Sequence, residues 1–235
     1  MNNSTVYLRV NRVAPEVCKA AVQVSIADIH EAMGPAGRLG LMSPRMRPLN
    51  RGLRVAGPAV TAYCAPGDNL MMHRALYLAQ PGDVLVVVCQ SEGSGAQWGD
   101  VAAQYAAHKK LAGVVVQGAT RDTDDLERMR FPVWSTAVSP IRPDKRGHGL
   151  VNAPVSCDGV IVNPGDLVVA DGDGVLVVPR GQAAAVIEAA RQRQQREEQF
   201  SQVIREGGHP WDFSGAAASY ATLDVTEIDA AFDDA

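Results

Sequence analysis

Two pairs of adjacent residues in the sequence could do chemistry together. Gly99-Asp100 stands where the alanine-rich segment "VAAQYAAHKKLA" begins, and Arg121-Asp122 follows the apolar run "GVVVQGAT". The free N–H groups at the start of a helix and an arginine fork both suit a carboxylate. Asp100 and Asp122 could bind a hard divalent cation whose octahedron is completed by water. Such a cation beside a bound 2-oxo acid would polarise the carbonyl group and stabilise an enolate.

Simpler interpretations of the same residues stay open at this point. Arg121 and Asp122 could form a surface ion pair, and Asp122 could cap the helix "TDDLERM". The later acids of that segment, Asp124, Asp125 and Glu127, are typical of a first helical turn, where the helix dipole favours negative charge. The two pairs meet only if the start of the helix and the end of the next strand lie at the same edge of the sheet. In open α/β sheets the loops that bind ligands usually lie together at one such edge.

The segments around these residues predict alternating helices and strands. Helices are expected from Pro15 to Met33 with Gly34 as cap, in "NLMMHRALYL" after an N-cap at Asp68, in "VAAQYAAHKKLA" up to Gly113, and in "TDDLERMR". Strands are expected in "RVAGPAVTAYCA", "DVLVVVCQ", "GVVVQG" and "FPVWSTAVS". The segments "PAGRLGLMSPRMRPLNRG" and "SEGSGAQWGD" are expected to be loops. This alternation indicates an α/β fold.

The last third of the chain has a different pattern. The segment "APVSCDGVIVNPGDLVVADGDGVLVVPR" holds three β-rich runs joined by Asp-Gly and Pro-Gly-Asp turns, which predicts a β meander. A long helix is expected from Gly181 to about Glu206, and its second half has charges and glutamines but few apolar residues. We therefore expect a single α/β catalytic domain over residues 1–180, and a C-terminal helix and tail over residues 181–235. Because the polar half of the helix can hardly be buried in its own domain, we expect it to contact a neighbouring subunit.

Composition and charge weigh against several classes of protein. The 235 residues are 46% hydrophobic, enough for a full core, and the net charge is −4 without an extended basic patch, which argues against nucleic-acid binding. The short basic cluster "IRPDKRGH" is interpreted as a solvated loop, and "EGSGAQWG" lacks the Lys-Ser/Thr of a phosphate-binding P-loop. The four separated cysteines match no zinc motif. With neither a signal peptide nor an apolar run of membrane-spanning length, we expect a soluble, cytoplasmic protein.

The stretch "GDVAAQYAAHKKLAGVVVQGATRDTDDLERMRFPVW" resembles the signature region of the class II pyruvate aldolases. These include 4-hydroxy-4-methyl-2-oxoglutarate and 4-carboxy-4-hydroxy-2-oxoadipate aldolase, and the same superfamily contains the regulator of ribonuclease activity A. The resemblance runs from "HEAMG" through "PGDNLMMH" and "PGDVLVV" to "PGDLVVADGDGVLVVP" and the long helix, so it covers roughly residues 20 to 207. It implies a swivelling α/β/β/α sandwich with a C-terminal helical extension. It also implies a homotrimer or homohexamer whose sites lie between subunits and use Mg²⁺ or Mn²⁺.

The resemblance implies roles for individual residues. Asp122 matches the direct metal ligand, Asp100 matches an acid that holds water at the metal, and Arg121 matches the arginine on the keto-acid end of the substrate. Glu197 lines up with a glutamate that the neighbouring subunit supplies, with Glu198 as the alternative. The remaining residues implied to bind substrate are the amides of the carboxylate cradle and two residues that line the pocket: Gly99, Asp100, Val101, Ala102, Asn69 and His73.

The chain departs from the family pattern at three places. Gln117 stands where an aspartate is usual, and the helix begins Gly-Asp-Val-Ala rather than Gly-Asp/Glu-Leu-Leu. The tail from His209 is longer and more aromatic than the resemblance leads us to expect.

The implied reaction is a retro-aldol cleavage of a 4-hydroxy-2-oxo dicarboxylate that releases pyruvate. Oxaloacetate decarboxylation is expected as a side activity because it passes through the same enolate. A non-catalytic protein that binds a ribonuclease is the alternative, and it predicts a broken set of site residues, whereas Asp100, Arg121, Asp122 and Glu197 are all present. A methyltransferase is disfavoured because the sequence shows no glycine-rich loop for S-adenosylmethionine.

Overall fold

The computed structural model describes residues 4–89 and 95–232. The chain forms two compact units, Met1–Arg191 and Gln192–Ala235. The boundary between them falls inside the helix α7 (Ala183–Arg205), whose first turns belong to the first unit.

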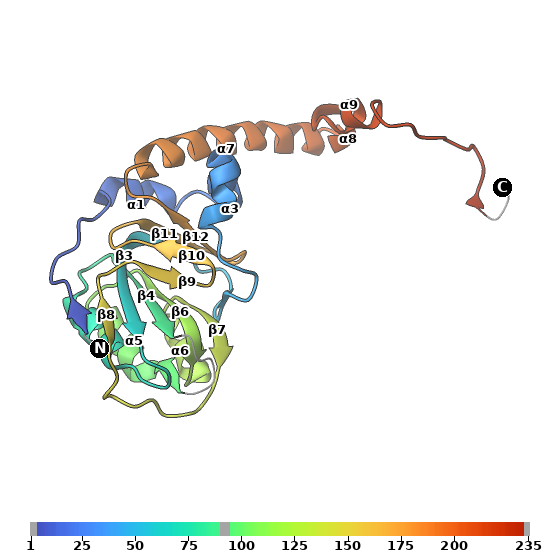
Figure 1. Ribbon diagram of the computed structural model, residues 1–235. Helices are drawn as coiled ribbons and strands as arrows, with labels where there is room; N and C mark the ends of the chain where they lie inside the picture. The colour runs from blue at the N-terminus through green and yellow to red at the C-terminus, as the bar shows by residue number, and fades with distance from the viewer. Residues whose placement is uncertain (1–3, 90–94, 233–235) are drawn as a thin grey trace. The chain divides into compact units, whose positions relative to one another are not determined.

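A large sheet forms the centre of the first unit (Figure 1). Its middle strands are parallel and follow the order β3 (Val55–Cys64), β4 (Val84–Cys89), β6 (Gly113–Thr120) and β7 (Val133–Val138). The flanking strands are β8 (Gly149–Val151), β1 (Thr5–Val6) and β2 (Arg47–Pro48). Every residue of β4 is buried, which explains its uninterrupted apolar sequence, because the sheet is covered on both faces.

Strand β3 is shared between two layers of the fold. Its first part, Val55–Pro58, pairs antiparallel with β11 (Leu167–Ala170), and its second part, Ala59–Cys64, pairs parallel with β4. β11 also pairs with β12 (Val175–Val178), and β9 (Val155–Cys157) forms a hairpin with β10 (Val160–Val162). The predicted meander is therefore confirmed as β structure, but it holds four strands rather than three.

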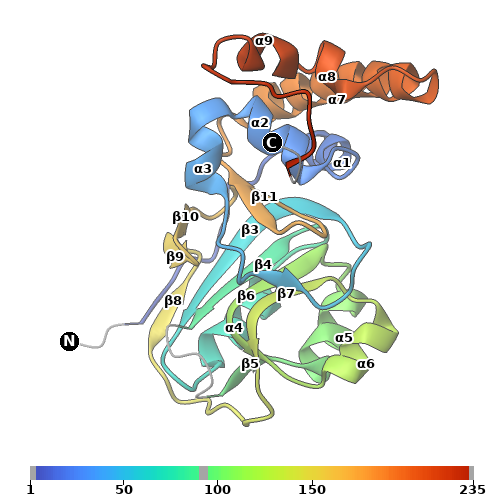
Figure 2. The same ribbon diagram turned by 90° about the vertical axis from the view of Figure 1, so that its right-hand side faces the viewer.

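The helices and strands of the first unit form layers (Figure 2). Three apolar cores lie between these layers. The first core packs α4 (Leu70–Leu78), α5 (Asp100–His108) and α6 (Thr123–Met129) against one face of the sheet. The second lies between the opposite face and the strands β9 to β12. The third packs α1 (Pro15–Ala21), α2 (Ile26–Ala32) and the start of α7 on β11 and β12. This order of layers agrees with the expected α/β/β/α sandwich.

Several predicted boundaries are corrected by the structure. The first helix is broken into α1 and α2 because the Ser25 side chain accepts the N–H of Asp28 at 3.0 Å and starts a new helix. The predicted loop after Gly34 contains a 3-10 turn, Gly34–Ala36, and the short helix α3, Gly37–Gly40. Helix α5 ends before Gly113, since Lys110 has a positive φ of 60°.

The second unit contains the polar end of α7 and the tail. The long helix is confirmed, and it is followed by α8 (Pro210–Phe213) and α9 (Ala216–Tyr220). Phe213 stacks on Phe200 of α7 with ring centroids 5.1 Å apart, so the first part of the tail folds against its own helix. Among the described residues, no helix is long and apolar enough to cross a membrane.

Candidate functional site

A short strand that the sequence analysis missed connects the two predicted residue pairs. β5 (Ala96–Trp98) lies in the predicted loop "SEGSGAQWGD", whose residues 91–94 are outside the described part of the chain. β5 pairs parallel with the end of β6, and the N–H of Arg121 donates to the carbonyl of Trp98 at 3.0 Å. The parallel register sets Gly99-Asp100 beside Arg121-Asp122 at the carboxyl edge of the sheet.

The Asp122 side chain points to the start of α5 and does not cap its own helix. Asp122 has a left-handed backbone, φ 56° and ψ 40°, and makes no side-chain cap bond with α6. Its Oδ2 lies 3.2 Å from Nε of Arg121 and accepts the N–H of Asp100 at 3.4 Å. The helix-cap interpretation of this carboxylate is therefore wrong, whereas the ion pair with Arg121 is present.

Gly99 makes this arrangement possible. A Cβ atom at position 99 would lie 2.7 Å from Oδ2 of Asp122 and 3.1 Å from Cγ of Arg121. The backbone of Gly99 is extended, with φ −166°, so space rather than backbone strain demands glycine here.

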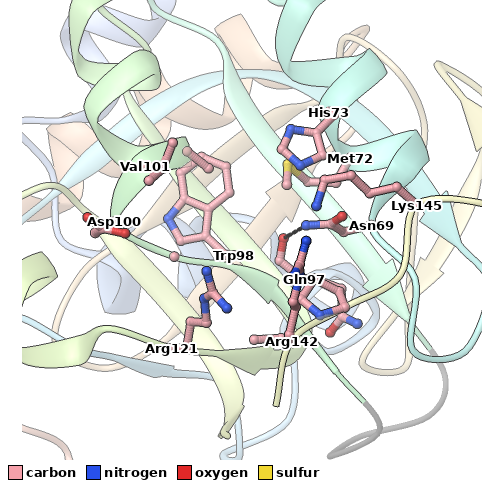
Figure 3. Close-up of a pocket in the computed structure, with 14 residues that line it drawn as sticks. Asn69, Met72, His73, Gln97, Trp98, Asp100, Val101, Arg121, Arg142 and Lys145 are labelled. Atoms are coloured by element: carbon pink, nitrogen blue, oxygen red, sulfur yellow. Dashed lines mark hydrogen bonds between the residues drawn. The ribbon is translucent and has the colours of Figure 1, made fainter. Parts of the chain in front are cut away.

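A cavity of about 430 Å³ opens beside these residues (Figure 3). Most of the predicted site residues line it together: Asn69, His73, Gly99, Asp100, Val101, Ala102 and Arg121. Asp122 lines an adjoining cavity of about 340 Å³, and Arg121 borders both. The amides of Val101 and Ala102 belong to the first turn of α5, where N–H groups have no intrahelical acceptor and favour anions.

Two buried polar atoms of the cavity lining have no hydrogen-bond partner among the described residues. Asn69, 6% exposed, donates through Nδ2 to the carbonyl of Gln97 at 3.4 Å, but its Oδ1 is unpaired. Nε1 of Trp98 is likewise unpaired. Unpaired buried polar atoms are costly, and a polar ligand in the cavity is one way to satisfy them.

The charges that line the cavity are mostly positive. Three cationic side chains line the cavity, those of Arg121, Arg142 and Lys145, and one carboxylate, that of Asp100. Burial lowers the pKa of His73 below its usual range, and the charge of Lys145 lowers it further. His73 is therefore largely neutral near pH 7, and the cavity suits an anion through its arginines, its lysine and its helix amides.

Arg142 and Lys145 are functional candidates that the sequence interpretation missed. Both come from "IRPDKRGH", which was interpreted as a solvated loop; both side chains are exposed, as that interpretation expects, but they also line the cavity. Asp68 holds the loop by accepting backbone N–H groups of Arg146 and Gly147. These bonds join segments far apart in the sequence, so no local pattern could have revealed them.

Glu197 and Glu198 do not belong to the unit that holds the cavity. Glu197 is in the second unit, where it pairs with Arg193 at 3.5 Å, and Glu198 pairs there with Arg205 at 3.0 Å. Gln117 accepts the N–H of Asp158 at 2.8 Å and so supports the turn between β9 and β10, away from the cavity.

The acids of the site fit a cation that keeps much of its water. Within the described residues no group of three or more His, Cys, Asp or Glu side chains gathers to hold a metal ion. The Asp122 side chain is 32% exposed and lies against the backbone N–H of Asp100, whose own carboxylate accepts from the Gln104 amide at 3.2 Å. Mg²⁺ is often bound by one or two carboxylates and several waters, so this donor set is compatible with it and would not suit a closed zinc site.

Comparisons with known proteins agree with this fold. A provisionally named 4-hydroxy-4-methyl-2-oxoglutarate aldolase of Halalkalibacterium halodurans is 38% identical over 163 residues, 69% of this chain and 78% of the relative. A protein of Burkholderia mallei with the same provisional name is 39% identical over 65% of this chain and 92% of its own length. The crystal structure of Streptomyces coelicolor RraAS2, described as an unusual member of the RNase ES inhibitor RraA family, matches with a TM-score of 0.72 and 33% identity over 83% of this chain and 99% of that one. The RraA-like family model, Aldolase/RraA, matches residues 26–177, and the chain belongs to this family.

Proposed function

We propose that this protein is a divalent-metal-dependent aldolase that cleaves a 4-hydroxy-2-oxo acid with carboxylates at both ends and releases pyruvate. The observation that carries the proposal is the junction of Arg121 and Asp122 with the first turn of α5, at the mouth of a cavity lined by cations. The provisional aldolase names of two relatives support the same class of reaction.

The 2-oxo acid end of the substrate binds at the start of α5. Its carboxylate accepts from the first-turn amides of Val101 and Ala102, which are also at the positive end of the helix dipole. The Arg121 guanidinium donates to the 2-oxo group. Because its Nε already lies 3.2 Å from Asp122, the arginine is held in place before substrate binds.

The bond between C3 and C4 breaks when the 4-hydroxyl group loses its proton. Water ordered by Asp100, and by Glu197 of the partner subunit, accepts that proton. The electrons of the C3–C4 bond move to the 2-oxo acid fragment, which becomes the enolate of pyruvate, and the C4 fragment leaves as a carbonyl compound. Arg121 stabilises the negative oxygen of the enolate, and protonation at C3 completes pyruvate.

Asp122 is the proposed direct ligand of Mg²⁺ or Mn²⁺, with Asp100 holding water near it. A cation bound there would act as a Lewis acid that favours the enolate. Oxaloacetate decarboxylation gives the same enolate, so it is the proposed side activity. The complete site is formed between subunits of a homotrimer or homohexamer, with residues 181–235 supplying the second subunit's part.

Release of pyruvate tests the proposal. The purified protein is incubated with 4-hydroxy-4-methyl-2-oxoglutarate or 4-carboxy-4-hydroxy-2-oxoadipate and Mg²⁺, and pyruvate is measured through lactate dehydrogenase. We expect turnover that EDTA abolishes and Mg²⁺ restores. If neither substrate nor oxaloacetate gives pyruvate with Mg²⁺ or Mn²⁺, the aldolase proposal fails. A non-catalytic protein that binds a ribonuclease then becomes the better candidate, since the Streptomyces relative is described as a member of a ribonuclease-inhibitor family.

A further inference from the structure

The loop between β7 and β8 is fastened to the start of α4 by a buried carboxylate. Asp68 is 3% exposed, and its Oδ2 accepts the N–H groups of Arg146 at 2.5 Å and Gly147 at 2.8 Å. Its Oδ1 accepts the N–H of Leu70 at 2.7 Å. A Cβ atom at Gly147 would lie 2.8 Å from Cγ of Asp68, so glycine is needed for this approach. Hydrogen bonds to a charged acceptor are strong, and they fix the loop relative to the cavity.

Backbone pairing holds the same loop at two further points. Asp144 donates to the carbonyl of Gly67 at 2.8 Å, and its own carbonyl accepts the N–H of Asn69 at 3.0 Å. The carbonyl of Ile141 accepts the N–H of Ala96, the first residue of β5, at 2.9 Å. The loop is thus tied to both sides of the cavity before any ligand binds.

This anchored loop presents two cations to the cavity. Arg142 and Lys145 both line it, and neither makes an ion pair with any residue that the structure describes. In Figure 3, Lys145 lies with Asn69 and His73 on the side of the cavity opposite Asp100. The charge of Lys145 is close enough to lower the pKa of His73.

The number of cationic side chains without an ion-pair partner in the cavity indicates how many carboxylates of the substrate can be bound there. In the proposed reaction, Arg121 and the α5 amides bind the 2-oxo acid end. Arg142 and Lys145 are left for the other end of the substrate. A C4-methyl dicarboxylate offers these two cations one carboxylate, whereas a substrate with a carboxyl group and a carboxymethyl group on C4 offers them two.

We propose that the loop anchored by Asp68 is the specificity element of this site, and that Arg142 and Lys145 select a 4-hydroxy-2-oxo tricarboxylate over the C4-methyl dicarboxylate. The kinetic part of this inference rests on the proposed aldolase function, and the binding part does not. Arg142 and Lys145 contact the substrate, while Asp68 is a positioning residue that acts through the loop.

Kinetics with both substrates test the selection. We expect kcat/KM of the unchanged protein to be about tenfold or more higher for the tricarboxylate, the size of one charge-assisted hydrogen bond. Lys145→Met and Arg142→Met should each remove most of this preference, chiefly by raising KM for the tricarboxylate. Arg146→Met is the matched control, because Arg146 is an exposed cation of the same loop that does not line the cavity. A preference for the dicarboxylate, or equal effects of all three variants, would overturn the inference.

Binding of unreactive acids separates this inference from the proposed function. Isothermal titration calorimetry without metal compares propane-1,2,3-tricarboxylate with glutarate. We expect tighter binding of the tricarboxylate, lost in Lys145→Met and Arg142→Met and retained in Arg146→Met. If this pattern is found in a protein that cleaves neither substrate, the selective subsite stands and the aldolase proposal fails. If both substrates are cleaved without preference and both acids bind equally, the subsite is wrong and the aldolase proposal stands.

Asp68→Asn tests the positioning role. The NH₂ of the amide would face either the N–H groups of the loop or that of Leu70, so the junction between the loop and the start of α4 should loosen. We expect the tricarboxylate-to-dicarboxylate ratio of kcat/KM to fall about as far as in Lys145→Met, with KM changed more than kcat. A uniform loss of activity with the ratio unchanged would show that Asp68 only stabilises the fold.

Discussion

Substitution of Gly99 by alanine probes the contact on which the proposed metal ligand depends. The new Cβ atom would lie 2.7 Å from Oδ2 of Asp122, shorter than real Cβ contacts allow. The backbone at position 99 is extended, a conformation open to any residue, so Gly99→Ala introduces no backbone strain. The methyl group must therefore displace the carboxylate of Asp122.

The size of the effect follows from which atoms can move. Relief of the overlap requires a shift of roughly half an ångström or more, and the short carboxylate side chain can give way more easily than the left-handed backbone at φ 56°. We expect the free energy of unfolding to change by less than about 1 kcal/mol, as for most single changes outside a core. Misplacement of a reacting group by about 1 Å can cost a hundredfold, so kcat/KM should fall by roughly tenfold to a hundredfold.

Three measurements decide the outcome. Pyruvate release gives kcat/KM, a Mg²⁺ titration gives the apparent affinity for metal, and thermal unfolding gives stability. We expect Gly99→Ala to lower kcat/KM and the apparent affinity for Mg²⁺, and to leave the thermal stability nearly unchanged. Gly172→Ala is the matched control, because no atom lies within 4 Å of a Cβ there and its φ is not positive. If Gly99→Ala keeps normal activity and normal metal dependence, the Asp122 carboxylate does not act where it lies in this structure.

The remaining predictions concern four other positions. Asp122→Asn keeps a residue that tolerates the left-handed backbone, so it should retain stability but abolish metal-dependent pyruvate release; full activity would remove Asp122 as the ligand. Arg121→Lys keeps the charge and loses the planar fork, and kcat/KM should fall about a hundredfold in the same assay. Inactive Asp122→Ala and Glu197→Ala chains should regain activity when subunits exchange; verified exchange without recovery would exclude the shared site. The pKa of His73 is lowered in the folded state, so the unfolded chain binds its proton first as the pH falls below about 6.5, and stability is lost from there downward. Thermal unfolding from pH 7.5 to 5 should show this loss, and His73→Gln should reduce it.

The strands of the large sheet were the most predictable part of the fold. The run from Val84 to Cys89 is buried at every position, and such runs are typical of strands inside a covered parallel sheet. The turn glycines were also informative, since Gly34 has a positive φ of 58° at the predicted end of α2. The break between α1 and α2 was missed because Ser25, a capping residue, lies inside a continuous helical pattern.

The parts of the site that were missed depend on contacts between distant segments. The strand β5 has only three residues, and its sequence, "AQW", has no alternation that a pattern could detect. It forms because Trp98 can pair with the end of β6 and bury its ring against Phe131, with centroids 6.0 Å apart. The basic loop carries no local sign of function either, since its position depends on Asp68.

In the proposed function, the two adjoining cavities would separate binding from catalysis. The larger one is lined by the first residues of α5 and the cations Arg142 and Lys145, which would bind an anionic ligand, whereas Asp122 borders only the smaller one. Arg121 lines both, so its loss should weaken carboxylate binding as well as turnover. Loss of the Asp122 carboxylate should stop turnover and leave the larger cavity able to bind a 2-oxo acid. Pyruvate binding measured in Asp122→Asn and in Arg121→Met therefore distinguishes a metal-dependent enzyme from a protein in which the same residues form only an anion site. If the residues form only an anion site, both variants should bind pyruvate with similarly reduced affinity. Arg121 and Asp122 would then act together as an ion pair, and loss of either side chain would have the same effect.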